Sequence, residues 1–308
     1  MRHLRIGTRG SLLAKWQAEF VRKQLFATMG VEAEIVIIKT SGDKLQTSSL
    51  SQIGGKGIFI KELEEALLEE TIDLAVHSIK DVPTDTPSRL MFPAVCRRED
   101  VRDCLVAANG ATLASLRQGA RVGTGSLRRQ AQLLHIRPDL DVRDLRGNVD
   151  TRLRKVESGE YEAVMLAKAG LDRLGWSGRI TETLNPEVFL PAVGQGAIGV
   201  ECRLKDTEAA DIVAGLDDAE TRTAIIAERS LLGALQGGCQ VPLGAWARIE
   251  RGELVLEACV CSVDGLQYVK QRATSAPDKA AELGGHMATL LIEAGAQGIL
   301  EEVSRQRG

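Results

Sequence analysis

The chain has 308 residues, of which 44% are hydrophobic and 26% charged, a globular composition long enough for two or three domains. A formal net charge of −3 argues against general nucleic-acid binding, and no apolar run is long enough to span a membrane. With only 3 Trp, 2 Tyr and 5 Phe, the cores must be aliphatic, which favours α/β layers. Residues 1–7 lack the apolar segment of a signal peptide, so we expect a cytoplasmic protein with reduced thiols. The six cysteines have neither metal-type nor Cys-x-x-Cys spacing, so we expect no metal site.

The first third of the chain alternates short apolar runs with amphipathic segments. The pattern predicts strands at Leu4–Thr8, Glu34–Ile38 and Ile72–Val76, and helices from Ser11 to about Met29 and over Lys61–Glu69. Strands that are separated by helices are typical of βαβ units, so we expect a mainly parallel sheet.

A second series of the same kind begins near Asp103. The predicted elements are strands at Arg121–Gly123, Asp141–Leu145 and Ala163–Leu166, and helices at Ser126–Ile136 and Val149–Glu157. Ser126 is the expected N-cap of its helix, which must stop before Pro138. Residues 191–196 look like a loop or hinge, and Ala197–Cys202 like a further strand.

The last third of the chain changes character. A helix is predicted from about Ala219 to Leu235, followed by three strands at Gly244–Ile249, Glu253–Val263 and Tyr268–Ala273. Gly and Asp residues between the strands suit tight turns, so an antiparallel meander is expected. A terminal helix of roughly 20 residues should start near Pro277. The pattern therefore predicts two α/β domains followed by a smaller α+β domain.

Two strand-to-helix turns are rich in arginine. Between residues 121 and 154 there are eight Arg and no Lys, including Arg128 and Arg129 in the first turn of a predicted helix. A helix N-terminus attracts anions, and guanidinium groups bind carboxylates through paired hydrogen bonds. The alternative is a capped helix with solvated arginines, although two cations at this end oppose the helix dipole.

The second turn, at residues 145–152, repeats this arrangement. If both turns follow parallel strands, they lie at the same edge of the sheet, where open α/β sheets bind ligands. The alternative is that Arg146 and Arg152 pair with nearby Asp144 and Asp150. Together the two turns predict a pocket for several carboxylates.

Two further segments near the N-terminus carry basic residues in loops. Arg9 lies in Thr-Arg-Gly-Ser at residues 8–11, at another strand-to-helix junction. Lys56 lies in Gly-Gly-Lys-Gly at residues 54–57, which lacks the spacing of a phosphate-binding P-loop. The glycine loop alone is weak evidence for a ligand site.

The sequence His-Ser-Ile-Lys-Asp-Val-Pro follows a predicted buried strand at residues 77–83. Pro83 should end regular structure, which leaves Lys80 and Asp81 at a strand end. A carboxylate there could stabilise a cation that forms nearby, whereas the alternative is a local ion pair or turn. We expect His77 to be packed rather than to act as a base.

Cys239 lies between two glycines and Pro242, in a tight loop that follows a long helix. Such a loop exposes the thiol, and a thiolate near cationic groups is readily alkylated. The usual alternative, a small apolar core residue, is expected for the other five cysteines. These are Cys96, Cys104, Cys202, Cys259 and Cys261.

Taken together and in this order, the motifs resemble those of the porphobilinogen deaminase (hydroxymethylbilane synthase) family. The matching segments are residues 8–11, 54–57, 77–83, 123–129, 145–152, Val-Gly-Gln-Gly-Ala at 193–197 and Gly-Gly-Cys-Gln-Val-Pro at 237–242. The resemblance implies two periplasmic-binding-protein-like α/β domains, with a third α+β domain that holds an antiparallel three-stranded sheet. The implied boundaries are 1–98 with 197–216, 99–196, and 217–308.

The resemblance implies a transferase that joins four porphobilinogen molecules head to tail, releases ammonia, and hydrolyses the product to hydroxymethylbilane. It also implies a dipyrromethane cofactor, made of two porphobilinogen units and held as a thioether to Cys239. Asp81 would be the catalytic carboxylate, which stabilises the positive charge on a pyrrole nitrogen and assists proton loss. A cytoplasmic monomer without nucleic-acid or membrane partners is expected.

The remaining site residues also follow from the resemblance, by their match to its motifs. Expected cofactor ligands are Ser78, Lys80, Thr124, Ser126, Arg128, Arg129, Arg146 and Asn148. Expected substrate ligands are Arg9, Ser11, Lys56, Phe59, Arg152, Arg173 and Gln195. One departure is visible, because Gly125 stands where the family pattern has serine; the missing hydroxyl should weaken a cofactor contact by about 1 kcal/mol.

Two other classes of protein share some of these features. A ligand-binding protein with two α/β domains would need neither Cys239 nor Asp81, and it usually carries an export signal. An anion-sensing transcriptional effector domain would be expected beside a helix-turn-helix segment, and none is evident in the sequence.

Overall fold

The computed structural model describes residues 3–40, 60–84, 87–235 and 241–305. The chain divides into two compact units, each formed from two separate stretches. Unit 1 comprises Met1–Glu99 and Gly196–Arg222, and unit 2 comprises Asp100–Gln195 and Thr223–Gly308. In the described residues, no helix is both long and apolar enough to cross a membrane.

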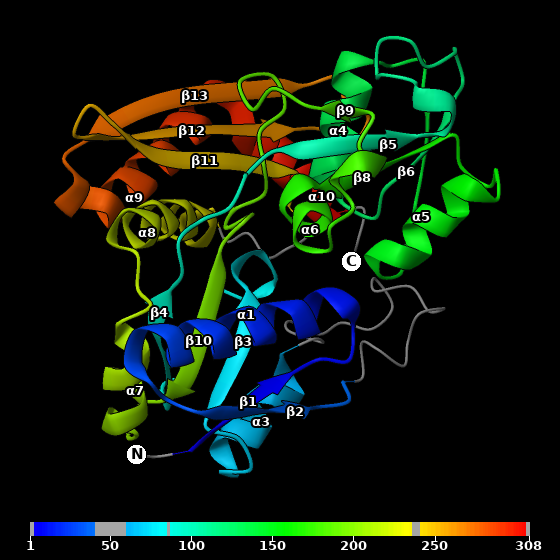
Figure 1. Cartoon of the computed structure of the whole chain (residues 1–308). Coiled ribbons are helices and arrows are strands. Elements are labelled where there is room, and N and C mark those ends of the chain that lie inside the picture. The colour runs from blue at the N-terminus through cyan, green and yellow to red at the C-terminus, as the bar shows by residue number, and fades with distance from the viewer. Residues whose placement is uncertain (1–2, 41–59, 85–86, 236–240, 306–308) are drawn as a thin grey trace. The chain divides into compact units, whose positions relative to one another are not determined.

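Unit 1 is built on a five-stranded mixed sheet with the strand order β2-β1-β3-β10-β4 (Figure 1). Its strands are β1 (Leu4–Thr8), β2 (Ala33–Ile37), β3 (Leu74–Ser78), β4 (Leu90–Val95) and β10 (Ile198–Arg203). β2, β1 and β3 are parallel, whereas β10 runs antiparallel to both β3 and β4. Four of the five strands therefore point the same way, as the predicted mainly parallel sheet requires, and β10, which belongs to the returning stretch of the chain, runs against them.

Helices cover both faces of this sheet. On one face, α1 (Leu12–Met29) and α7 (Thr207–Ala214) share an aliphatic core with β1. On the other face, α3 (Lys61–Leu68) packs Leu63 and Leu67 into a second core. α1 begins at the predicted N-cap and ends at Gly30, whose φ of 64° suits glycine.

Unit 2 contains a second five-stranded sheet, with the order β7-β6-β8-β5-β9. Its strands are β5 (Asp103–Ala107), β6 (Arg121–Gly123), β7 (Asp141–Arg143), β8 (Ala163–Ala167) and β9 (Glu182–Thr183). β7, β6 and β8 are parallel, and β5 runs antiparallel to both of its neighbours. The second sheet therefore repeats the arrangement of the first, with three parallel strands beside an antiparallel one.

Three helices flank this second sheet. α4 (Leu127–Ile136) contributes Leu133 to the core on one face. α5 (Val149–Glu157) and α6 (Lys168–Arg173) pack on the opposite face. The predicted helix bounds at α4 and α5 are confirmed, including the N-cap at Ser126.

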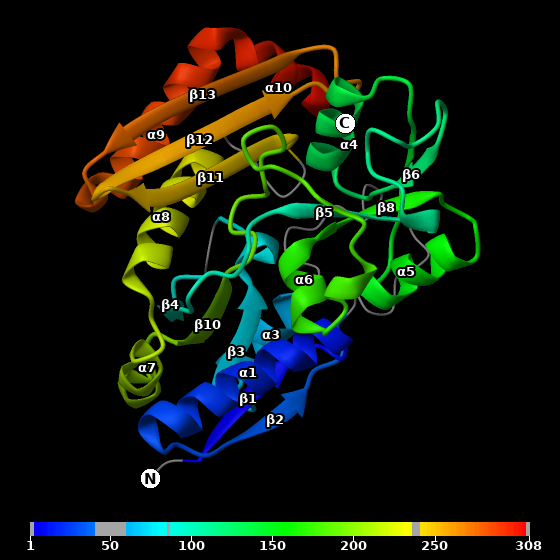
Figure 2. The same ribbon diagram turned by 45° about the horizontal axis from the view of Figure 1, so that its top comes forward.

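The rest of unit 2 is an antiparallel sheet with helices on one side. Figure 2 shows its strands β11 (Leu243–Glu250), β12 (Glu253–Cys261) and β13 (Tyr268–Ser275) side by side. α8 (Ala219–Ala234) and α9 (Ala280–Leu291) share one apolar core with this sheet. The predicted meander is confirmed, and with it the fold class of two α/β sheets and a smaller antiparallel sheet with helices.

The single terminal helix that we expected is wrong. α9 is followed by an irregular turn at Ile292–Ala296, after which α10 (Gln297–Arg305) begins. Gly295 has a φ of 103°, which is incompatible with a continuous helix. The apolar spacing continues across the break, so periodicity alone could not show it.

The five described cysteines lie in the cores, as predicted. Each is at most 4% exposed and none forms a disulfide. Burial raises the pKa of the Cys104 thiol to about 12 and that of Cys202 to about 11. These thiols are therefore protonated at neutral pH and act as small apolar side chains.

Candidate active site

In unit 1, two loops with predicted site residues follow neighbouring parallel strands. β1 pairs with β3 in the register Ile6 to Leu74, so their carboxyl ends meet at the same edge of the sheet. Arg9 and Ser11 lie in the loop after β1, and residues 78–81 come at the end of β3. The fold therefore brings these two predicted loops to one edge.

A buried amide links these two loops. Gln17, on the inner face of α1, is 3% exposed, and its Nε2 donates a 2.8 Å hydrogen bond to Ser78 Oγ. Ser11 Oγ accepts a hydrogen bond from Ala14 N as the N-cap of the same helix. Sequence reasoning missed Gln17, although a polar residue on the apolar face of a helix is a usable signal.

The predicted catalytic carboxylate lies in a short 3-10 turn at Ile79–Asp81. Ile79 is buried and anchors the turn, Lys80 is half-buried, and Asp81 is exposed. The turn thus presents a carboxylate at the end of a buried strand, as the sequence predicted.

His77 is packed within the sheet, also as predicted. It is 5% exposed, and its Nε2 lies 3.0 Å from Oε2 of the buried Glu201. The ring of Phe92 approaches it edge-on at 5.9 Å between centroids. These contacts make His77 part of the core rather than a base that is open to a substrate.

In unit 2, the arginine-rich turns also share one edge. β7, β6 and β8 are neighbouring parallel strands, and residues 145–152, 123–129 and 168–173 follow their carboxyl ends. The predicted meeting of the first two turns is therefore confirmed. Arg173 joins this edge as the last residue of α6 and is 8% exposed.

Hydroxyl groups shape the turn that begins α4. Thr124 is 2% exposed, and its Oγ1 accepts a hydrogen bond from the backbone N–H of Ser126 at 3.2 Å. Ser126 Oγ accepts from the backbone N–H of Arg129 at 3.4 Å, which completes the N-cap. The small side chains thus fix the start of the helix that carries both arginines.

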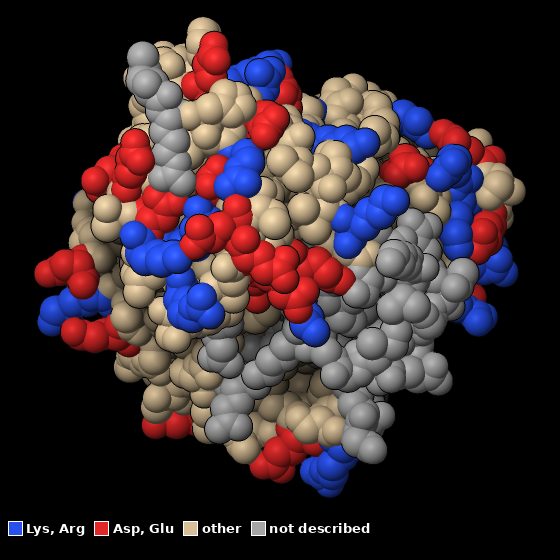
Figure 3. Space-filling view, turned by 90° about the horizontal axis from the view of Figure 1, so that it is seen from below, with Lys and Arg blue, Asp and Glu red and all other residues tan. Residues whose placement is uncertain are grey.

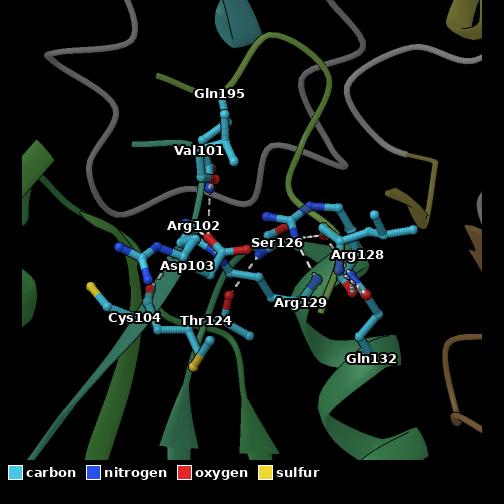
Figure 4. Close-up of polar contacts among 12 residues, drawn as sticks. Val101, Arg102, Asp103, Cys104, Thr124, Ser126, Arg128, Arg129, Gln132 and Gln195 are labelled. Carbon is cyan, nitrogen blue, oxygen red and sulfur yellow. Dashed lines mark hydrogen bonds and ion pairs between the residues drawn. The ribbon is translucent and has the colours of Figure 1, made fainter. Parts of the chain in front are cut away.

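Arg128 and Arg129 are buried and share one carboxylate, that of Asp103 (Figure 4). Arg128 Nη1 lies 2.7 Å from Asp103 Oδ2, and Arg129 Nη2 lies 2.7 Å from Oδ1. Arg128 Nη1 also donates to Leu190 O, and Arg129 Nη1 donates to Met165 O. The alternative of a helix with solvated arginines is therefore wrong.

Asp103 also binds Gln195, another predicted site residue. Gln195 Nε2 donates to Asp103 Oδ1 at 3.0 Å and to Val101 O at 2.8 Å. Burial by itself raises the pKa of Asp103, but the charges of Arg128 and Arg129 outweigh it and hold that pKa well below its usual range. Asp103 is therefore an internal anion that offsets two cations at a helix N-terminus.

Sequence reasoning missed Asp103 as a site residue. It stands at the start of β5, next to the charged stretch 97–102, and 25 residues before Arg128. Nothing in the local sequence distinguishes it from Asp100, which pairs with Arg102. Its role depends on long-range pairing between β5 and β8.

The second turn shows a different pairing of arginines. Arg146 Nε donates to Asp144 Oδ2 at 2.9 Å, which is one of the local pairs that we considered. Arg152 Nε donates to the carbonyl oxygen of Gly147, and Asp150 pairs with Arg154 instead. The alternative of local pairing therefore holds for Arg146 with Asp144 but not for Arg152 with Asp150, because Asp150 pairs with the residue one helical turn later.

Asn148 takes the N-cap position of α5 with no side-chain capping bond. The residue is half-buried. Its side-chain amide is therefore not committed to closing its own helix, unlike the hydroxyl of Ser126 at the start of α4.

Gly125, where the family pattern has serine, packs against the start of the second arginine turn. A Cβ at this position would lie 2.9 Å from Leu145 O and 3.2 Å from Asp144 Oδ1. Any larger residue would push the two turns apart. The glycine that replaces the family's serine at position 125 thus fits a space that is too narrow for a side chain.

Three predicted site residues lie outside the described part of the chain. They are Lys56, Phe59 and Cys239. On the face drawn in Figure 3, acidic and basic side chains are interspersed.

Comparison with known proteins assigns the family. The family model described as "Porphobilinogen deaminase, dipyromethane cofactor binding domain" matches residues 4–211, and that of the C-terminal domain of the same family matches residues 222–293. The porphobilinogen deaminase of Syntrophobacter fumaroxidans is 47% identical over 305 residues, which cover 99% of this chain and 99% of the relative. That of Trichlorobacter lovleyi is 48% identical, covering 98% of this chain and 97% of its own.

One solved structure that matches this chain has a much lower sequence identity. An arginine-specific periplasmic binding protein from Salmonella typhimurium is 15% identical, covers 70% of this chain and 92% of its own, and has a TM-score of 0.40. The assignment rests instead on the two family models, which together span most of the sequence, and on relatives that match nearly from end to end. The chain belongs to the porphobilinogen deaminase family.

Proposed function

We propose that this protein joins four porphobilinogen molecules head to tail, releases one ammonia for each, and hydrolyses the product to hydroxymethylbilane. It would thus be a transferase of tetrapyrrole biosynthesis. The observation that carries the proposal is the match of residues 4–211 to the cofactor-binding domain of this family, because that stretch contains the turns described above.

The residues of the arginine turns fit a dipyrromethane. Each pyrrole of such a group carries two carboxylates, which need cationic and hydroxyl partners. At the carboxyl edge of β6 and β7, the chain offers guanidinium groups, capping hydroxyls and an amide that makes no capping bond. In addition, Arg128 Nε is buried without a hydrogen-bond partner among the described residues.

We therefore propose that these side chains hold the cofactor, together with residues at the end of β3. The proposed ligands are Ser78, Lys80, Thr124, Ser126, Arg128, Arg129, Arg146 and Asn148. When bound, a dipyrromethane supplies a nucleophilic pyrrole carbon on which the product is built, and we propose the Cys239 thiol as its thioether anchor.

Arg128 and Arg129 would bind the cofactor while they keep their ion pairs with Asp103. Because both already share Asp103, a bound carboxylate would join a cluster of two cations and one anion, which keeps a net positive charge. Such a cluster holds its side chains fixed before the ligand arrives, so little side-chain entropy is lost on binding.

Asp81 is the proposed catalytic residue. Loss of ammonia from porphobilinogen leaves positive charge on the pyrrole nitrogen, and a carboxylate that accepts a hydrogen bond from that N–H stabilises the charge. The same carboxylate can then accept a proton after the new bond forms. The exposed position of Asp81 beside the buried Ile79 suits a group that meets a substrate while its backbone stays fixed.

The other predicted residues would bind the substrate, with the arginines holding its acetate and propionate groups. They are Arg9, Ser11, Lys56, Phe59, Arg152, Arg173 and Gln195. Support comes from the position of Arg9 and Ser11 at the carboxyl end of β1, beside the turn that carries Asp81.

We further propose three domains, at 1–98 with 197–216, 99–196, and 217–308, and a monomer that acts in the cytoplasm. Five buried free thiols suit a reducing compartment. Limited proteolysis would test the boundaries, and sedimentation would test the oligomeric state.

The activity is tested by incubating the full-length protein with porphobilinogen and measuring ammonia and hydroxymethylbilane together. The wild type should release four ammonia molecules per bilane, and Asp81→Asn should lose nearly all turnover. Binding of porphobilinogen without ammonia release would instead identify a binding protein. Near-normal turnover by Asp81→Asn would assign the catalytic role to another residue.

A further inference from the structure

A short segment of unit 2, Leu190–Gln195, is held by the side-chain amide of Gln132. Gln132 Nε2 donates to Leu190 O at 3.0 Å, and Gln132 Oε1 accepts from Leu190 N at 2.8 Å. Gln132 is 1% exposed and Leu190 is fully buried. One amide therefore satisfies both backbone groups of a buried residue, as a neighbouring strand would.

The same segment is bound to α8 and β11. Ala245 N donates to Pro191 O at 2.9 Å. Glu228 of α8 accepts from Gly194 N at 2.7 Å through one carboxylate oxygen and from Ala247 N at 2.8 Å through the other. The segment thus lies beside the edge strand β11, whose outward N–H groups are satisfied by Pro191 O at Ala245 and by Glu228 at Ala247.

The packing around this connection is close. A Cβ at Gly244 would lie 2.7 Å from Leu190 Cβ and 3.0 Å from Cys259 Sγ. Cys259 Sγ in turn lies 3.7 Å from Gln132 Oε1. A shift of Leu190 would therefore be transmitted directly to β11 and β12.

The elements joined in this way are those that flank the proposed cofactor ligands. α4 begins at the turn with Ser126, and Gln132 lies one turn after Arg128, which donates to the same Leu190 O. α8 and β11 lie on either side of residues 236–240, which include Cys239. Segment 190–195 is therefore a direct link between the arginine turn and the two elements on either side of residues 236–240.

We propose that Gln132 is a positioning residue, which holds segment 190–195 and so fixes α8 and β11, the elements on either side of residues 236–240, relative to the arginine turn. The inference rests on the proposed function, because it concerns where the dipyrromethane is anchored. Glutamine suits this role because its amide has one donor group and one acceptor, which match the C=O and N–H of Leu190. A methionine has nearly the same volume but cannot make the two bonds.

The experiment compares the attachment rate in three full-length apoproteins: wild type, Gln132→Met and Gln130→Met. Gln130 is a half-buried residue of the same helix and serves as the matched control. Each protein is incubated with porphobilinogen, and intact mass follows the gain of two pyrrole units at a temperature where all remain folded. We expect attachment to be at least tenfold slower in Gln132→Met and unchanged in Gln130→Met.

A second readout uses the loaded enzymes. If Gln132 positions the anchor, kcat should fall in Gln132→Met by a larger factor than KM for porphobilinogen rises, because only one proposed substrate ligand, Gln195, lies in the segment that Gln132 holds. Gln132→Glu keeps the volume and the acceptor but loses the donor, and it should show the same effects if Gln132→Met does not fold.

The outcomes distinguish a failure of the positioning role of Gln132 from a failure of the proposed cofactor attachment. A variant that melts earlier but attaches the cofactor at the wild-type rate would overturn the positioning role and leave the function intact. A wild-type protein that never gains two pyrrole units would overturn the proposed anchoring, and the inference with it.

Discussion

Asp103 Oδ1 lies 2.7 Å from Arg129 Nη2 inside unit 2, where the two side chains are 0% and 7% exposed. The same carboxylate also binds Arg128 and Gln195. Arg128, Arg129 and Gln195, which we predicted from the sequence to bind ligands, are thus held by Asp103, which we did not predict as a site residue. The strength of this cluster leads to the first two predictions.

Asp103→Asn should strongly destabilise the protein. The change leaves two buried arginines without their counter-ion, and breaking a buried pair in this way typically costs about 3–5 kcal/mol. Urea unfolding at pH 7 measures the loss. Asp100→Asn is the matched control, because its partner Arg102 is 42% exposed and a partly solvated pair should contribute about 1 kcal/mol or less. Equal losses in the two variants would contradict the account.

Acid should unfold the protein partly through Asp73 and Asp103. Burial by itself raises the pKa of Asp73, but hydrogen bonds from Arg5 and Arg203 outweigh it, so both aspartates have a pKa well below the usual value. Carboxyls with a lowered folded pKa stabilise the protein above their unfolded pKa of about 3.9, and that contribution is lost as the pH falls below it.

The free energy of unfolding should therefore drop as the pH is lowered from about 4, near the unfolded pKa of aspartate. Asp73→Asn should show a shallower drop than the wild type, because one titrating group has been removed. Urea unfolding at a series of pH values measures both slopes. Identical slopes would show that this carboxylate contributes nothing to acid stability.

Gly125→Ala should destabilise unit 2 by about 1–3 kcal/mol, the usual cost of overpacking. The added methyl group would lie 2.9 Å from Leu145 O, so the two arginine turns must separate. Gly178→Ala is the control, since nothing lies within 4 Å of a Cβ there. Thermal unfolding of both variants tests this, and a Gly125→Ala protein as stable as the control would contradict it.

Gln17→Leu should lower kcat clearly while it changes the melting temperature only slightly. The variant removes the donor to Ser78 Oγ, a bond that is worth about 0.5–1.5 kcal/mol, and lets a proposed cofactor ligand reorient. Steady-state kinetics and thermal unfolding, compared with Gln24→Leu on the same helix, measure the two effects. Unchanged kinetics in Gln17→Leu would show that the orientation of Ser78 does not matter.

Local elements with clear start and stop signals could be predicted from the sequence, whereas others, such as β4 and α7, were missed. α4 illustrates this, because Ser126, the apolar spacing and Pro138 mark its start and its end. The meander at β11–β13 was equally visible, since turn residues separate alternating strands. These signals lie within a few residues of the elements that they define.

Features that depend on distant parts of the chain could not be predicted. The antiparallel place of β10 in the sheet of unit 1 depends on the return of the chain after a separate unit. Asp103 and Gln132 act through partners 25 or more residues away, so neither has a local signal. Gly295 breaks the terminal helix within an unbroken apolar pattern.

The most direct test of the account is the intact mass of freshly purified, active protein, followed by peptide mapping. We predict a covalent addition equal to two pyrrole units, located on Cys239 and absent from Cys239→Ser. A bare Cys239 thiol in protein that converts porphobilinogen at full rate would contradict the account.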